Sequence, residues 1–141
     1  MIYGTGFNVF YSQAKRSSEK NEAERCNIQL AGELRQATSV TSAQQTSLTF
    51  TVDTDSDGVD ETIQYTWSGT SGQPLNRVVA TVTTAMVNKI SSAAFTYYDA
   101  NNSQLSFPVT ASQVRLVSLS LTVTDQNETF NLRSQFRLSS L

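Results

Sequence analysis

The segment from Val52 to Trp67 holds the densest group of side chains that could do chemistry. Gly58 follows three alternating aspartates, so the segment matches the first half of an EF-hand loop, D-x-D-x-D-G. Ca²⁺ prefers about six to eight oxygen ligands, and alternating aspartates supply several of them from one turn. The segment therefore predicts a metal site built from the following carboxylates: Asp53, Asp55, Asp57, Asp60 and Glu61.

The rest of the segment departs from a standard EF-hand. The twelfth position, normally a bidentate glutamate, is Gln64, and an amide cannot supply two anionic oxygens. Alternating apolar residues on both sides predict strands rather than helices, at 48–52 and 63–67. A looser site in a hairpin loop remains, with Ca²⁺ as the ion because every candidate ligand is oxygen. The alternative is a solvated acidic turn without metal, since Asp and Gly are ordinary turn residues.

Catalysis has little support in the sequence. The chain has no histidine, which removes the commonest general base. It has no G-x-S-x-G motif and no second acidic site that could face the loop. Its one cysteine, Cys26, cannot form an intrachain disulfide and is expected to be buried. A net charge of −2 argues against nucleic-acid binding. We therefore expect a protein that is not an enzyme.

The elements that position the loop begin with a predicted N-terminal helix over residues 1–38. From Ser12 to Ala37 helix formers dominate and there is no proline. Apolar residues at helical spacing form a stripe that should face a core: Ala23, Cys26, Leu30, Ala31, Leu34 and Ala37. Ile28 lies off this stripe, and it is either an isolated exposed apolar residue, which is common on protein surfaces, or a contact to the helix of a neighbouring subunit. The first half of the helix is polar all round, so we expect it to pack against other chains.

Residues 46–141 are predicted to be β-rich, with about six or seven short strands in alternating apolar patterns. The third strand is expected to include Val78, Ala80 and Val82, and a short helix is expected within 84–94. Residues 114–138 are expected to form a long hairpin. The fold class is therefore α+β, in which a long N-terminal helix packs on an antiparallel β-sheet within one domain, 1–141.

The order of these elements resembles the type IV pilin superfamily, and within it minor pilins and minor pseudopilins of the PilW and J types. The acidic turn is followed by Ile63 and Tyr65, as in that family. "QPLNR" at 73–77 resembles its next conserved segment, and "FTYYD" at 95–99 resembles a later strand. The family's hydrophobic N-terminal half-helix is missing from this sequence, and we expect that it anchors the natural protein in the membrane.

The resemblance implies a structural subunit of a type IV pilus or a type II secretion filament, in the bacterial cell envelope. Its partners would be other pilins or pseudopilins. The expected helix interface comprises Phe7, Tyr11, Ile28 and Arg35. The alternative function is a secreted, calcium-stabilised β-rich binding or adhesion module, in which exposed aromatic residues would bind sugar or another partner.

Overall fold

The computed structural model describes residues 7–11, 18–53, 57–125 and 128–138. They form eight β-strands, one α-helix and one short 3₁₀ helix. The elements are β1 (Phe7–Tyr11), α1 (Ser18–Arg35), β2 (Ser39–Ala43), β3 (Ser47–Val52), β4 (Glu61–Trp67), β5 (Gln73–Val79), β6 (Val82–Tyr98), η1 (Ala111–Gln113), β7 (Leu116–Asp125) and β8 (Glu128–Arg137).

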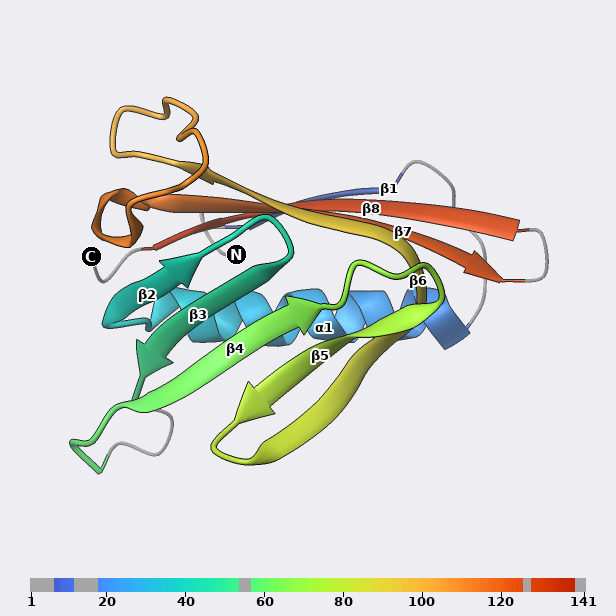
Figure 1. Ribbon diagram of the computed structural model, residues 1–141, viewed down its shortest axis with the longest axis horizontal. Helices are drawn as coiled ribbons and strands as arrows, with labels where there is room; N and C mark the ends of the chain where they lie inside the picture. Colours follow the sequence, from blue (N-terminus) through green and yellow to red (C-terminus); the bar gives the residue numbers. More distant parts are fainter. Residues whose placement is uncertain (1–6, 12–17, 54–56, 126–127, 139–141) are drawn as a thin grey trace.

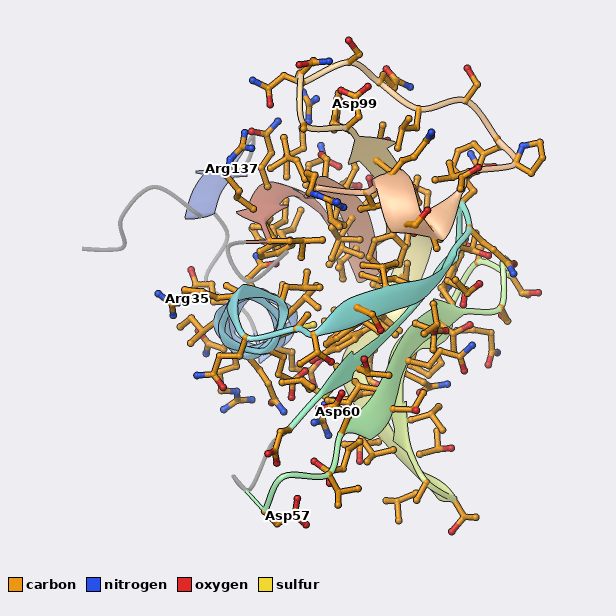
Figure 2. The ribbon with its side chains drawn as sticks, turned by 90° about the vertical axis from the view of Figure 1, so that its left-hand side faces the viewer. Arg35, Asp57, Asp60, Asp99 and Arg137 are labelled. Atoms are coloured by element: carbon orange, nitrogen blue, oxygen red, sulfur yellow. The ribbon has the colours of Figure 1, made fainter. Side chains whose placement is uncertain are left out.

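All eight strands belong to one antiparallel sheet with the order β1-β8-β7-β6-β5-β4-β3-β2. The sheet curls into a half-barrel, and α1 lies along its inner side (Figure 1). Helix α1 contacts β6 and β8 and also β3, which belongs to the other half of the sheet. Figure 2 looks along α1 and shows the sheet curving round one side of it.

Strand β6 is the element that bends the sheet. Its first part pairs with β5 and its second part with β7, with register shifts on both sides of Ile90. Lys89, next to these shifts, has a φ of 60°, a left-handed conformation that non-glycine residues rarely adopt. Bulges of this kind bend a strand and increase its twist. The bend lets strands from both halves of the sheet, β3 and β8, contact the same helix.

The predicted α+β fold class with a long N-terminal helix is wrong. The protein is mostly β, and the α-helix in the described residues spans only the 18 residues of α1. Residues 7–11, expected in the helix, form β1 and pair with β8 from Phe7↔Phe136 to Tyr11↔Leu132. The physical reason is composition: aromatic and β-branched residues favour a strand, and β8 offers them an open edge.

The predicted apolar stripe of α1 is largely confirmed. Five of its six members are fully buried, and Ala31 is half-buried: Ala23, Cys26, Leu30, Leu34 and Ala37 have no exposed surface. Burial, with a smaller contribution from the nearby Glu33 carboxylate, raises the pKa of the Cys26 thiol to about 12. The thiol is therefore protonated at neutral pH and a weak nucleophile.

Two further predictions fail in the β-rich region. The short helix expected within 84–94 is part of β6, because ladders on both sides satisfy its backbone groups. The third strand was expected to continue through Ala80, but β5 ends at Val79 and the chain turns at Ala80, with a φ of 56°. Residues 39–43 form β2, ahead of the predicted start of the β-rich region.

Candidate functional site

The acidic loop joins β3 to β4, as the alternating flanks predicted. Asp53 directly follows β3, and its carboxylate accepts hydrogen bonds from two backbone amides, Asp57 N at 3.2 Å and Gly58 N at 2.8 Å. The Asp57 carboxylate accepts one from Val59 N at 2.8 Å. Gly58 has a φ of 85°, which a glycine adopts without strain. These bonds fold the loop back toward the end of β3.

Three of the five predicted metal ligands come together in this loop. One carboxylate oxygen each from Asp53, Asp57 and Glu61 lies within 4.8 Å of the others. This acidic triad could hold a metal ion. Asp60 points elsewhere, since its Oδ2 accepts a hydrogen bond from Thr38 Oγ1 at 2.8 Å. Asp55 lies outside the described residues.

A second candidate surface is the outward face of α1. Ile28 is 67% exposed, which confirms its predicted place off the buried stripe. Between Asn21 and Arg35, the exposed charged residues of α1 are Arg25 and Arg35, whereas the glutamates there are partly buried. The face that α1 turns away from the sheet is therefore an isoleucine between two arginines.

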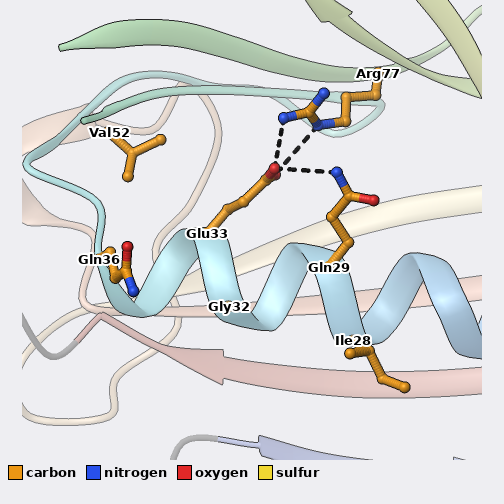
Figure 3. Close-up of a pocket in the computed structure, with 7 residues that line it drawn as sticks. All are labelled: Ile28, Gln29, Gly32, Glu33, Gln36, Val52 and Arg77. Atoms are coloured by element: carbon orange, nitrogen blue, oxygen red, sulfur yellow. Dashed lines mark hydrogen bonds and ion pairs between the residues drawn. The ribbon is translucent and has the colours of Figure 1, made fainter. Parts of the chain in front are cut away.

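A hollow of about 320 Å³ lies beside this face, between α1 and the strands β3 and β5 (Figure 3). Val52 of β3 and Arg77 of β5 line one side. Helix α1 and the residue directly after it supply the other side, with Ile28, Gln29, Gly32 and Glu33 in the helix and Gln36 just beyond its end. Gly32 has no side chain, so the surface of the helix is open at this point. The hollow is a recess on the outer surface where the helix meets the sheet.

Glu33 fastens α1 to the sheet at the base of the hollow. Its carboxylate pairs with Arg77 Nη2 at 2.5 Å and accepts a hydrogen bond from Tyr65 Oη at 2.7 Å. The side chains of Arg77 and Glu33 are only 19% and 13% exposed. Burial, and then the neighbouring Glu33 carboxylate, raise the pKa of Tyr65 well above its ordinary value. Tyr65 therefore remains a neutral donor to Glu33 at physiological pH.

Glu22, near the N-terminal end of α1, makes a second attachment of the helix to the sheet. Its carboxylate accepts hydrogen bonds from the backbone amide and the side-chain amide of Asn88, both at 3.0 Å. Asn88 lies beside the bulge of β6. The two glutamates hold the same side of α1 against the β5–β6 part of the sheet. The sequence pattern did not reveal these roles, because the partners Arg77 and Asn88 are far from the helix along the chain.

The four residues of the predicted helix interface lie on two different elements. Ile28 and Arg35 are both on the outward face of α1 and both exposed. Phe7 and Tyr11 are in β1, so they do not belong to this helix. Of the strand aromatics that a sugar-binding module could use, Tyr65, Trp67 and Tyr97 are buried in the core, as is usual for aromatic residues on strands, and Tyr98 is half-buried.

The comparisons with known proteins give no relative. The sequence matches no protein-family model and has no significant match among curated proteins. In the part of the chain that the structure describes, no helix has the length and apolar character needed to cross a membrane.

Proposed function

We propose that this protein is a structural subunit that acts by packing against other subunits, as a minor pilin or pseudopilin does in a type IV pilus or a type II secretion filament. The observation that carries the proposal is the outward face of α1. A helix that has already buried one stripe in its own sheet gains nothing for the monomer from a large apolar residue on the opposite face.

Three features support a packing role. Ile28 is exposed on the outward face, and the hollow beside it is a recess that a side chain of another subunit could fill. Glu22 and Glu33 hold the helix rigidly, which lowers the entropic cost of using it as an interface. The sequence segments after the acidic loop resemble those of minor pilins. The proposal does not depend on the long helix, which the structure replaces by β1 and α1.

The test is a substitution in the native gene of the source bacterium. We expect Ile28→Asp to reduce co-purification with pilin-like subunits, and filament assembly, by about tenfold or more, because a desolvated charge at an interface centre costs over about 1.4 kcal/mol. The matched control is Val82→Asp, since Val82 is also an exposed apolar residue, at 63%, but lies on β6. Normal assembly in the Ile28→Asp strain, or equal losses in both strains, would refute the proposal.

A second proposal concerns the acidic triad, for which Ca²⁺ is the ion we propose. All three carboxylates are hard oxygen ligands, and the loop's own backbone amides already orient two of them. Calcium would stabilise the β3–β4 hairpin rather than take part in a reaction. Such a loop would equally suit a secreted, calcium-stabilised β-rich module, the alternative function.

Calcium is expected to raise the melting temperature. A ligand that binds only the native state adds about 2.7 kcal/mol at a concentration of about 100 times its Kd. For a domain of this size the rise should be about 5–10 °C. The measurement is thermal unfolding by circular dichroism, with excess Ca²⁺ and with a chelator.

Asp53→Asn should abolish this rise. The matched control is Asp99→Asn, because Asp99 also accepts two backbone hydrogen bonds in a turn, from Asn101 and Ser103, but lies outside the triad. That variant should keep the full response to calcium. Identical melting curves with calcium and with chelator would show that the acidic triad does not bind calcium in the native protein.

A further inference from the structure

The β3–β4 loop carries charges of the opposite sign to those on the outward face of α1. Val59 is 63% exposed, and exposed aspartates, Asp57 and Asp60, lie on both sides of it. On α1, Ile28 is 67% exposed and lies between exposed arginines, Arg25 and Arg35. Each surface is thus an apolar side chain flanked by like charges, and the signs on the two surfaces are opposite.

The hollow beside Ile28 is a recess that an apolar side chain of the loop could enter. Its volume of about 320 Å³ is enough to receive a valine side chain together with part of its loop. Ile28 offers apolar contact, and Gly32 leaves the helix backbone open to close approach. Arg77 on the inner wall is paired with Glu33, which also lines the hollow, so the positive charges that face an incoming loop are those of Arg25 and Arg35.

We propose that the hollow beside Ile28 is the docking site for a second copy of this chain, whose Val59 enters it from the β3–β4 loop. The charges favour this occupant: the aspartates of one copy meet the arginines of the other, and opposite potentials speed and orient association. The proposal rests on the proposed packing function and names the first partner, this same chain.

The positions of the two surfaces indicate a two-fold arrangement. The hydrogen bond from Thr38 to Asp60 ties the loop to the segment that directly follows α1. Figure 2 shows Arg35, Asp57 and Asp60 on the side of the molecule that faces the viewer. Because loop and hollow are neighbours, a two-fold axis lets each copy place its loop in the hollow of the other, which closes the assembly as a dimer.

Cross-linking between differently tagged copies tests the contact directly. A copy carrying Ile28→Cys is mixed with a copy carrying Val59→Cys, and diamide oxidises the paired thiols to a disulfide. The control pair is Ile28→Cys with Val82→Cys, since Val82 and Val59 are equally exposed, at 63% each. Cys26 is fully buried and does not compete.

We expect at least about tenfold more heterodimer from the Val59→Cys pair, because docking gives those thiols a high effective concentration. Sedimentation equilibrium should show a reversible dimer for the unmodified chain that weakens as salt rises. Ile28→Asp and Val59→Asp should be monomeric, and Val82→Asp should still dimerise. Unchanged melting temperatures would show that the variants are folded.

Equal yields from both cysteine pairs, or a monomer at every concentration, would overturn this inference. That outcome is separate from failure of the proposed function. A chain that stays monomeric in solution but depends on Ile28 for co-purification with other subunits would keep the packing role and lose the second copy as its partner. A chain that dimerises through Val59 but joins no filament would keep the second copy as its partner and lose the proposed role in a filament.

Discussion

Replacing Leu34 by alanine is expected to lower the free energy of unfolding by about 2–5 kcal/mol, the range for deleting a buried leucine side chain. Leu34 is fully buried in the stripe that α1 turns toward the sheet. The sheet curls round the helix from both sides, so its neighbours cannot easily collapse into the space. Urea unfolding followed by circular dichroism measures the change.

Ile28→Ala is the matched control for this prediction. Isoleucine and leucine contain the same atoms, and both residues lie on α1, but Ile28 is 67% exposed. Its replacement should change the free energy of unfolding by no more than about 0.5 kcal/mol. A similar cost at both positions would contradict the described placement of α1 on the sheet.

Glu33→Ala is expected to cost about 1.5–3 kcal/mol, the range for hydrogen bonds that involve a charged group. The substitution removes the acceptor of both Arg77 and Tyr65, and these donors are then left largely buried without their partner. Urea unfolding again gives the value. Gln29→Ala is the control, because Gln29 donates to the same carboxylate at 3.2 Å but from an exposed position. It should cost less than about 0.5 kcal/mol.

A double variant distinguishes the loss of the Glu33–Arg77 ion pair from the cost of leaving one buried charge without its partner. Glu33→Leu with Arg77→Met replaces both charges by apolar groups, so no buried charge is left unpaired. We expect this double variant to be more stable than Glu33→Ala, since removing both partners of a partly buried pair is often nearly neutral. A double variant that is less stable than either single variant would show that the attachment depends on packing rather than charge.

The hairpin around the acidic loop could be predicted from the sequence because its signal is local. Residues 48–52 and 63–67 alternate strictly, and the loop between them is rich in turn residues. The same holds for the buried stripe of α1 and for the exposure of Ile28. Alternation and helical spacing report which face a residue occupies, and both depend only on near neighbours in the chain.

The largest failures are places where residues far apart in the sequence pair with each other. Residues 7–11 form a strand because β8, more than 120 residues further along, offers an edge. Residues 84–94 form a strand because β5 and β7 both pair with them. In the acidic loop the sequence pattern did not decide between Asp60 and Glu61 as a ligand, whereas in the structure Asp60 bonds to Thr38 and Glu61 lies with Asp53 and Asp57. A sequence pattern contains no information on those choices.

The order of the strands has a consequence for how the protein folds. Strands β2 to β8 are neighbours in the sheet in the same order as in the chain, so their pairings close loops much shorter than the whole chain, the longest of them residues 99–115 between β6 and β7. Strand β1 pairs with β8, from Phe7 to Phe136, and must close almost the whole chain. Loop-closure entropy makes that step costlier by about 2 kcal/mol than closing a hairpin. During synthesis β1 leaves the ribosome before the other described strands, yet it can take its place only after β8 has been made.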